Sequence, residues 1–354
     1  MIKIFNFRHY SKSDGLIAQR IRGAQPDRRG ILWLATDKGL INFDGFRFHT
    51  IPFLSSQTPY INDLSALCLD PQSEKIWLTT YNEGLICYDR SLPIASSVKK
   101  YTATVGPKRL IKNELYTVLV SSTGKVYFGG QETELQYYDP RNDSVQYIRL
   151  SKSKRYETIF SIREDPKGQI WVGTRYGGIY IYNPKTQEVA NVNLHNIGEN
   201  GGRHFTFIGN KVYLNYYDYN LSLLDYNRKE IIAKDLLHIG KNNDYYDNEL
   251  TDICYLKADN MLMLSHRKNG LYFYNLQSNT IQKIDWAAIS PNFKSKARIN
   301  SLIPTDQGVY IASDVGLYFY SKTLNLINDL VDLKQPVREI FKVNDRNWYL
   351  GNDH

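Results

Sequence analysis

The side chains that could do chemistry in this chain form no known reactive motif. The nucleophile elbow G-x-S-x-G, the zinc motif H-E-x-x-H, the P-loop and the dinucleotide motif G-x-G-x-x-G are all missing from the sequence. The seven His residues have no metal-ligand spacing, and the three Cys residues form no C-x-x-C pair. The acidic pair Glu164-Asp165 could supply an acid and a base, but Asp165 falls at a turn. We therefore predict no catalytic residue, no metal site and no cofactor.

Side chains suited to binding are more prominent. Tyr occurs 28 times, and its ring can stack and hydrogen-bond at once, while Arg forks pair with carboxylate or sulfate. These residue types gather in polar segments between apolar runs. The residues that we predict to contact a ligand are Arg20, Tyr60, Asn62, Tyr81, Arg175, Tyr176, Arg203, His204, Tyr217, His266, Arg267, Arg298 and Arg338. The alternative is that these segments are ordinary polar surface loops.

A repeat spaces these polar segments. In each unit, a Gly or Asn turn precedes an aromatic or apolar anchor, which is followed by a small residue, a polar turn and an apolar-aromatic strand. The anchors are Trp33, Trp77, Tyr127, Trp171, Tyr213, Met263, Tyr310 and Trp348. They are about 45 residues apart on average, which is typical of a unit of four strands.

One unit illustrates the four predicted strands. Strands A to D cover Thr158–Asp165, Gln169–Thr174, Gly178–Asn183 and Val189–Leu194. Turn signals recur about every ten residues, and no segment has a persuasive helical period. Runs such as "IYIY" are apolar throughout, as expected where both faces of a sheet pack against neighbours. The sequence therefore predicts an all-β protein, a β-propeller of four-stranded blades.

The number of blades follows from the complete units. Seven complete units favour seven blades, and eight is the alternative. The segment Lys3–Tyr10 resembles a strand D and is predicted to close the ring beside the last blade. Residues 1–354 are then a single propeller domain. A partial eighth unit at residues 337–354 either begins a following propeller or joins the N-terminal strand in an eighth blade.

Turn residues have predictable structural roles. Gly30, Gly124, Gly168 and Gly308 fall between strands A and B, where Gly permits a positive φ. The Asp or Asn residues expected to cap the turn between strands C and D are Asp44, Asp89, Asp139, Asn183, Asp225 and Asn275. The large residue of strand B is expected to fill the space between neighbouring blades.

The propeller fold places the predicted binding residues on one face. The loops that precede strand A and those that join strands B and C lie together around the central channel, and loops on a rigid scaffold often bind ligands. The formal charge of +8 and the pI of about 9.1 favour an anionic ligand. No run of five Lys or Arg residues occurs, so we expect no nucleic acid to bind this domain. An acidic or sulfated oligosaccharide is favoured.

Two units resemble a known repeat, that of the two-component regulator propeller family. Its pattern has a DGL start, a D-x-x-G-x-[LI]-W-x-[GA]-T core and a G-L-x-x-[FY]-[DN] close. The matching residues of the first unit are Asp14, Gly15, Leu16, Asp27, Gly30, Trp33, Thr36, Gly39, Leu40, Phe43 and Asp44; those of the fourth are Asp165, Gly168, Trp171, Gly173, Thr174, Gly178, Tyr182 and Asn183. The outline of the repeat covers almost the whole chain, with looser matches in the third, fifth and sixth units.

This resemblance implies a role in sensing. Propellers of that family form the periplasmic sensor region of hybrid two-component systems, typically in gut Bacteroidetes, where they detect glycan fragments. Two propellers are commonly followed by a β-sandwich, a membrane helix, a histidine kinase and a response regulator. The sequence contains no kinase motif and no run of 18 apolar residues, so we interpret the chain as the first propeller of a longer, dimeric sensor.

Alternative interpretations remain open. The chain could be a protein-protein interaction propeller, or a propeller lyase or hydrolase acting on polysaccharide, because fold alone does not fix function. The N-terminal residues lack the apolar core of a signal peptide. A periplasmic location, as implied by the resemblance, therefore requires a signal peptide that this sequence does not include; a cytoplasmic location is the alternative.

Overall fold

The computed structural model describes most of the chain. The described residues are 7–52, 63–104, 109–151, 158–175, 177–192, 204–216, 219–238, 249–267, 269–284, 298–321, 339–344 and 347–351. Helical structure among them consists of three short 3-10 helices, η1 (Lys12–Asp14), η2 (Ile94–Ser96) and η3 (Lys257–Asp259). In this part of the chain, no helix is long and apolar enough to cross a membrane.

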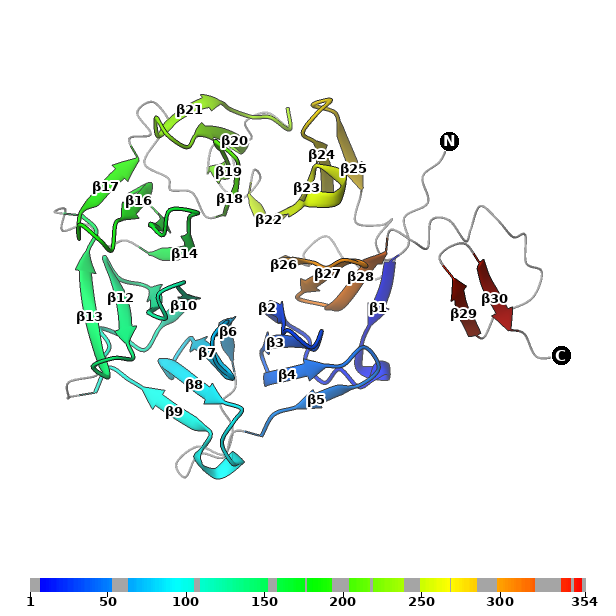
Figure 1. The fold of residues 1–354 in the computed structure, drawn as a ribbon, viewed down its shortest axis with the longest axis horizontal. Helices are drawn as coiled ribbons and strands as arrows, with labels where there is room; N and C mark the ends of the chain where they lie inside the picture. The colour runs from blue at the N-terminus through cyan, green and yellow to red at the C-terminus, as the bar shows by residue number, and fades with distance from the viewer. Residues whose placement is uncertain are drawn as a thin grey trace.

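Seven four-stranded antiparallel sheets are arranged in a ring, so the protein is a seven-bladed β-propeller (Figure 1). The first six blades follow the order of the chain. They are β2–β5 (Ile21–Pro26, Leu32–Thr36, Gly39–Phe43, Phe48–Thr50), β6–β9 (Leu64–Leu69, Lys75–Thr80, Leu85–Asp89, Val98–Tyr101), β10–β13 (Leu115–Val120, Val126–Gly130, Glu134–Asp139, Ser144–Arg149), β14–β17 (Ile159–Glu164, Ile170–Thr174, Ile179–Tyr182, Val189–Val192), β18–β21 (Phe205–Ile208, Lys211–Tyr216, Tyr219–Asp225, Glu230–Ala233) and β22–β25 (Leu250–Leu256, Met261–His266, Gly270–Asn275, Ile281–Ile284).

The seventh blade joins the two ends of the ring. Its inner three strands are β26 (Ile299–Pro304), β27 (Gly308–Ser313) and β28 (Gly316–Ser321). Its outer strand is β1 (Phe7–Tyr10), which pairs antiparallel with β28. The prediction of a ring closed by the N-terminal strand is confirmed, and seven blades are confirmed over eight; residues 3–6 of the predicted strand lie outside the described residues.

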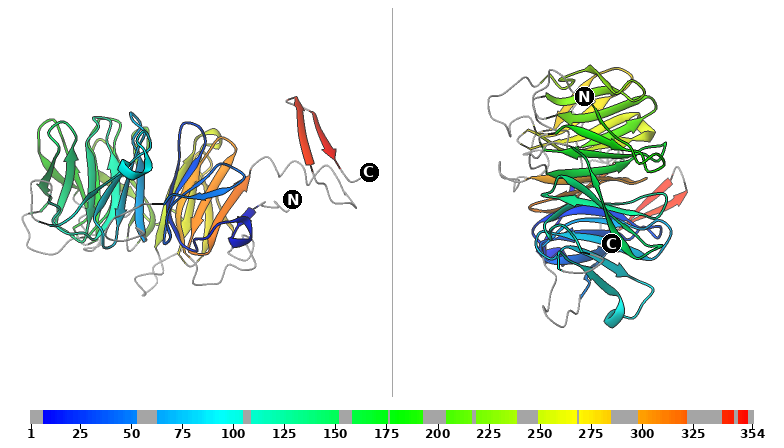
Figure 2. Two further views of the ribbon diagram at one scale, coloured as in Figure 1. Left: turned by 90° about the horizontal axis from the view of Figure 1, so that it is seen from below. Right: turned by 90° about the vertical axis from the view of Figure 1, so that its left-hand side faces the viewer.

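A separate hairpin follows the ring. Strands β29 (Glu339–Asn344) and β30 (Asn347–Gly351) pair with each other in a two-stranded sheet. Figure 2 shows this hairpin beside the ring and outside its blades. That residues 337–354 begin a second propeller stays a prediction.

Large strand-B side chains pack between blades, as predicted. Trp171 in β15 is fully buried and belongs to one apolar cluster with Phe205 and Val212 of the next blade. Its ring lies 5.2 Å from that of Phe207 and stacks on that of Tyr226 at 6.1 Å. The buried "IYIY" run of β16 packs in the same way on both faces. Burial of aromatic surface at each junction stabilises the ring.

The predicted turn chemistry holds at all but one position. The side-chain oxygen of each predicted Asp or Asn accepts a backbone N–H two residues later. Gly30, Gly124 and Gly168 have φ of 81°, 79° and 79°. Gly308 was expected to need a positive φ, and this was wrong. It starts β27, where a Cβ would lie 2.1 Å from the carbonyl oxygen of Tyr320, so close approach of the backbone explains this Gly.

A recurrent β-bulge shapes the inner strands. In β2, β6, β10, β14, β22 and β26, the register with the neighbouring strand shifts after the first residue. One residue of each inner strand is therefore left out of the ladder. A bulge redirects the side chain of the extra residue. The six redirected residues are Arg22, Ser65, Tyr116, Phe160, Thr251 and Asn300.

Candidate ligand site in the central channel

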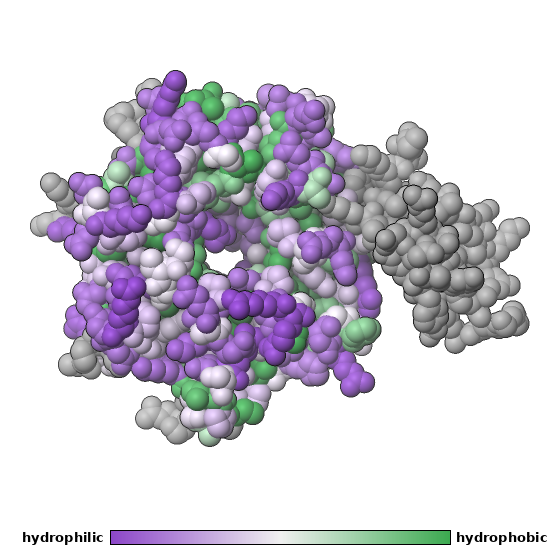
Figure 3. All heavy atoms as spheres, in the orientation of Figure 1, coloured by the Kyte–Doolittle hydropathy of each residue, from purple (hydrophilic) through white to green (hydrophobic). Residues whose placement is uncertain are grey.

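All six bulged residues line one cavity of about 480 Å³, here called the channel cavity. The other residues that line it are Arg20, Tyr81, His204, Arg298 and Asp314, so every blade contributes at least one residue. Because inner strands from all blades meet there, the cavity lies at the channel of the ring. Figure 3 shows an opening at the centre of this ring. The volume of the channel cavity is in the range of ordinary ligand pockets.

One side of the channel cavity is aromatic. Tyr81, Tyr116 and Phe160, here called the aromatic arc, come from three successive blades. The ring centroids of Tyr81 and Tyr116 lie 5.8 Å apart, and Tyr116 stacks on Phe160 at 5.9 Å. Burial raises the pKa of both Tyr side chains, so both phenols are neutral at physiological pH. The arc offers ring faces on which an apolar sugar face could stack.

The facing side of the cavity is polar and includes positively charged side chains. It consists of His204, Thr251, Arg298, Asn300, Asp314 and Arg20, here called the polar arc. The Nη2 atom of Arg298 lies 3.3 Å from Oε1 of Glu249. The backbone of Arg20 exchanges two hydrogen bonds with Asp37, at 3.2 and 3.1 Å, and no hydrogen bond of its side chain is seen among the described residues. Guanidinium groups in such a setting can bind carboxylate or sulfate.

Three bulged side chains link neighbouring blades through hydrogen bonds. Arg22 donates to the carbonyl of Leu64, Ser65 to that of Leu115, and Asn300 to that of Ile21, each at the first residue of the next inner strand. The distances are 2.9, 2.6 and 2.9 Å. These three residues therefore have a structural role as well as a place in the cavity wall.

His204 is oriented by a buried carboxylate. Its Nδ1 lies 3.4 Å from Oδ1 of Asp252, and Oδ2 of the same carboxylate accepts the backbone N–H of Leu302 at 2.7 Å. Burial acts to raise the pKa of Asp252, but the hydrogen bond with His204, the guanidinium of Arg163 and the backbone N–H of Leu302 outweigh it, and the pKa is lowered. The carboxylate is ionised and fixes the imidazole at the cavity wall, an arrangement that can also serve acid–base chemistry.

The structure brings together four of the predicted ligand residues. Arg20, Tyr81, His204 and Arg298 line the channel cavity. Arg175, Arg267 and His266 are described but are not among the residues that line it. The remaining predicted residues, Tyr60, Asn62, Tyr176, Arg203, Tyr217 and Arg338, lie outside the described residues.

His266 has a structural position that the sequence did not reveal. Its side chain is fully buried, and its Nδ1 accepts the backbone N–H of Asn269 at 3.2 Å. Thr36, Thr80 and Thr174 end strand B of other blades, and their hydroxyls accept the equivalent N–H in the same way. Burial lowers the pKa of His266 to about 4. Its position therefore does not support the prediction that it contacts a ligand.

Seven residues of the cavity wall were not among the predicted ligand residues. They are Arg22, Ser65, Tyr116, Phe160, Thr251, Asn300 and Asp314. All but Asp314 are bulged residues, and a bulge leaves no mark in the sequence of an inner strand. A usable signal does exist, since each bulged residue precedes the strand-B anchor of its blade by ten to twelve residues.

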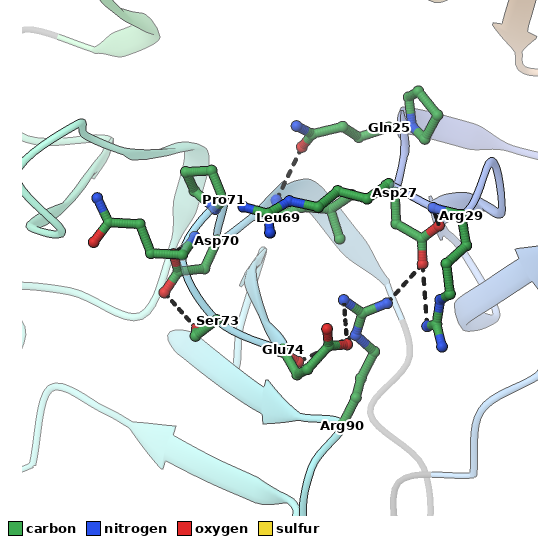
Figure 4. Close-up of a pocket in the computed structure, with 12 residues that line it drawn as sticks. Gln25, Asp27, Arg29, Leu69, Asp70, Pro71, Ser73, Glu74 and Arg90 are labelled. Atoms are coloured by element: carbon green, nitrogen blue, oxygen red, sulfur yellow. Dashed lines mark hydrogen bonds and ion pairs between the residues drawn. The ribbon is translucent and has the colours of Figure 1, made fainter.

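A second cavity, of about 510 Å³, lies at the other end of β2 and β6 and is here called the turn-side cavity (Figure 4). Four of its charged groups, those of Asp27, Arg29, Glu74 and Arg90, bind each other. Nη1 of Arg90 lies 2.8 Å from Oδ2 of Asp27, and Nη2 lies 2.8 Å from Oε2 of Glu74. Asp27 also accepts the indole N–H of Trp33 at 3.2 Å. Burial opposes ionisation of Asp27, but these donors outweigh it and lower the pKa of Asp27.

The same arrangement recurs in the fourth blade. Asp165 accepts the indole N–H of Trp171 at 2.9 Å and the hydroxyl of Tyr226 in the next blade at 2.8 Å. The structural interpretation of Asp165 is therefore supported by its contacts. Among the described residues, no group of three or more His, Cys, Asp or Glu could hold a metal ion.

Comparison with known proteins identifies the repeat. Residues 153–176 match the two component regulator propeller family, as predicted from the sequence. The fourth blade therefore carries a repeat of this family. No curated protein matches the chain.

Solved structures share the fold at low sequence identity. The extracellular domain of the hybrid two component system BT3049 from B. thetaiotaomicron is 20% identical, with a TM-score of 0.72 over 99% of this chain and 47% of that one. The corresponding domain of BT4673 from the same organism is 16% identical, with a TM-score of 0.66 over 90% of this chain and 39% of that one. The chain thus spans less than half the length of these relatives.

An enzyme has the same fold. Virginiamycin B lyase from Staphylococcus aureus is 10% identical, with a TM-score of 0.67 over 90% of this chain and 99% of that one. At these identities the likeness concerns the fold alone.

Proposed function

We propose that this propeller is the ligand-binding part of a hybrid two-component sensor and that it binds a glycan fragment in the channel cavity. The observation that carries this proposal is the two-sided wall of that cavity. The aromatic arc suits the apolar face of a sugar ring, and the polar arc opposite supplies donors to hydroxyl and acidic groups. Arg20 and Arg298 favour an acidic or sulfated oligosaccharide.

The match of residues 153–176 to the two component regulator propeller family supports a proposal for the wider assembly. In the parent protein, a second propeller, a β-sandwich and a histidine kinase would follow this domain, and the parent would be a homodimer in the inner membrane. This domain would face the periplasm. Ligand binding would then change how the domains or protomers are arranged and so alter kinase activity. The domain itself would bind ligand without turning it over.

A lyase is the second candidate, because one observation favours it. His204 is held by the ionised Asp252 at the cavity wall, which suits a general base. Virginiamycin B lyase is similar in fold to this chain. A protein-protein interaction propeller is the third interpretation, for which the loops around the channel would form the contact surface.

Calorimetry and thermal shift with a panel of oligosaccharides separate these candidates. The panel should pair each acidic or sulfated oligosaccharide with its neutral counterpart. A sensor should bind at least one acidic member and leave it chemically unchanged after prolonged incubation. Formation of an unsaturated or hydrolysed product would support the enzyme instead. A panel with no binding member would contradict the glycan proposal.

A further inference from the structure

His204 and Asp252 form a histidine–carboxylate pair at the wall of the channel cavity. Nδ1 of His204 lies 3.4 Å from Oδ1 of Asp252, and the two side chains are 20% and 11% exposed. Backbone groups also hold the carboxylate, since Oδ1 accepts the N–H of Ile253 at 2.8 Å and Oδ2 that of Leu302 at 2.7 Å. His204 lines the cavity, so the imidazole is the part of the pair that a ligand can contact.

Asp252 departs from the pattern of the other inner strands. It directly follows the bulged residue of β22. The residues at the same place in the other five bulged strands are small and uncharged, namely Gly23, Ala66, Thr117, Ser161 and Ser301. Burial of a carboxylate is costly unless strong partners bind it. A neutral acceptor would suffice for the two backbone N–H groups, so His204 is the partner that explains a charge at this place.

The second ring nitrogen of His204, Nε2, is open to the cavity. Among the described residues it has no hydrogen-bond partner, and it is not one of their buried, unpaired polar atoms. Because Nδ1 is turned toward Asp252, the opposite edge of the ring, which carries Nε2, faces the cavity. The ionised Asp252 can only accept a hydrogen bond, so the proton of the neutral ring is on Nδ1. Nε2 of the neutral ring therefore has a lone pair, which accepts a hydroxyl hydrogen and repels an anion.

We propose that His204 selects anionic ligands by taking up a proton: when both ring nitrogens are protonated, Nε2–H donates to a carboxylate or sulfate group in the channel cavity, while Nδ1–H remains on Asp252. The proton comes from the solvent. Asp252 is the positioning residue, since it holds the ring and its charge favours the protonated form. This inference rests on the proposed function and adds that an acidic ligand binds together with one proton.

Carboxylates near His204 favour a positive charge on its ring. Besides Asp252, the channel cavity contains Asp314, which accepts a hydrogen bond from Asn300 at 2.8 Å. The phenols of the aromatic arc are neutral at physiological pH and add no charge. Protonation of the ring in the folded protein is therefore within reach of ordinary pH values.

Arginine side chains oppose this charge. Arg20, Arg22 and Arg298 line the same cavity, and Arg163 is close enough to Asp252 to help lower the pKa of its carboxyl. The charges of Arg22 and Arg298 are partly balanced by an acid each, at 2.7 and 3.3 Å. A bound anion offsets the remaining positive charge, so the ring takes up a proton more readily when the ligand is present. By reciprocity, protonation of the ring strengthens anion binding by the same factor.

Anionic and neutral sugars should therefore differ in their pH dependence. An anionic sugar should bind about tenfold more tightly at about pH 6 than at about pH 8, because the protonated ring supplies a charge-assisted hydrogen bond. A hydroxyl group can donate to the neutral ring or accept from the protonated ring. The affinity of a neutral sugar should therefore change little over the same range.

Histidine NMR of the whole chain tests the inference without a known ligand. The Cε1–Hε1 signal of His204 is assigned by its loss in His204→Gln, and its pH midpoint is measured alone and with glucuronate, glucose 6-sulfate or glucose. We expect the midpoint to rise by about one pH unit with one or both anionic sugars and to stay in place with glucose. The two anions distinguish carboxylate from sulfate. A midpoint that neither anion moves, or that glucose moves equally, overturns the inference.

A pair of histidine variants tests the link to binding. His204→Gln should bind the anionic sugar with similar affinity at both pH values, because an amide does not titrate. His49→Gln is the matched control, since Nε2 of His49 also lies 3.4 Å from a carboxylate, that of Asp44, but both side chains are exposed. This control should keep the wild-type pH dependence. A His204→Gln variant that keeps it as well contradicts the proposal.

Asp252→Asn tests the positioning role. Loss of the negative charge should lower the pH midpoint of His204 in the absence of ligand. A purely structural Asp252 would lower the melting temperature and leave this midpoint unchanged, which would contradict its positioning role. The titration of the wild-type chain decides the main inference even if this variant fails to fold.

The outcomes also separate this inference from the proposed function. If glucuronate raises the midpoint of His204 but no oligosaccharide binds, the proton-linked anion site stands and the glycan sensor is contradicted. If an acidic oligosaccharide binds equally well at both pH values and leaves the midpoint in place, the sensor stands and the role of His204 is wrong.

Discussion

The two cavities of this propeller have similar volumes, about 480 and about 510 Å³, and lie at opposite ends of the same inner strands. They are built in different ways. The turn-side cavity contains residues of the repeat, such as Asp27, and its charged groups are engaged with Arg90 and Glu74. The channel cavity is built from positions at which the blades differ from each other. The comparison teaches that two cavities of similar size in one fold can differ in origin, one formed by the repeat and one by departures from it.

The largest expected effect is loss of stability on the turn side. Asp27→Ala removes a carboxylate that is 5% exposed and bound to Arg90 and Trp33. We expect the free energy of unfolding in urea to fall by about 3 kcal/mol, because a buried guanidinium loses one partner. Ligand affinity should not change.

Asp70→Ala is the matched control for this variant. Asp70 is in the corresponding turn of the second blade, where its carboxylate accepts bonds from Gln72 and Ser73 of its own turn. We expect a loss of about 1 kcal/mol. Equal losses in the two variants would contradict a special role for the Asp27–Arg90 pair.

The second effect is pH dependence on the channel side, where His266 replaces the usual Thr. The pKa of His266 is lowered to about 4 from an ordinary value of 6.5, because burial disfavours the charged ring. As the pH falls below 6.5, the unfolded chain takes up a proton that the folded chain refuses until about pH 4. Stability is therefore lost through this window, by about 2 kcal/mol at pH 4.5.

His266→Thr should remove this part of the pH dependence. Thr can accept the same backbone N–H, as Thr36, Thr80 and Thr174 do. Urea unfolding at pH 7.5 and 4.5 measures the difference between the two proteins. The same fall in stability in both would show that His266 does not titrate as described. Loss of the pH dependence in His266→Thr would show that a residue that departs from the repeat on the channel side can have a purely structural role.

The third and smallest effect concerns the aromatic arc. Tyr116→Ala should weaken glycan binding by about two- to tenfold, since an aromatic contact is worth about 0.5–1.5 kcal/mol. Phe46→Ala removes an aromatic ring that is 91% exposed in an outer turn and should leave affinity unchanged. Calorimetry with a glycan that binds the wild-type chain makes the comparison. Equal affinities in the two variants would remove the arc from the site.

The fold was largely predictable because each repeat unit contains the residues whose contacts stabilise its own blade. Trp171 and Asp165 recur with fixed spacing, and the structure joins them by a hydrogen bond of 2.9 Å. Gly308 was misread because a close backbone contact and a positive φ both select Gly. Such patterns involve residues that are close together in the chain, so a single sequence is enough to predict them.

The site was less predictable because it depends on geometry between blades. Phe160 reaches the cavity through a bulge, which a run of apolar residues does not reveal. Arg298 of the cavity wall pairs with Glu249, 49 residues away in the chain, and the sequence does not reveal this pairing. Loop composition did identify Arg20, Tyr81, His204 and Arg298, since loops near the channel contribute directly to its wall.

One pair of variants tests most directly whether the channel cavity is the ligand site. Arg20 and Arg28 are exposed residues at opposite ends of β2, and each lines one of the two cavities. Arg20→Trp places a large ring in the channel cavity, and Arg28→Trp places the same ring in the turn-side cavity. Calorimetry with an acidic oligosaccharide should show binding lost in Arg20→Trp and kept in Arg28→Trp. Binding kept in Arg20→Trp and lost in Arg28→Trp would contradict the account.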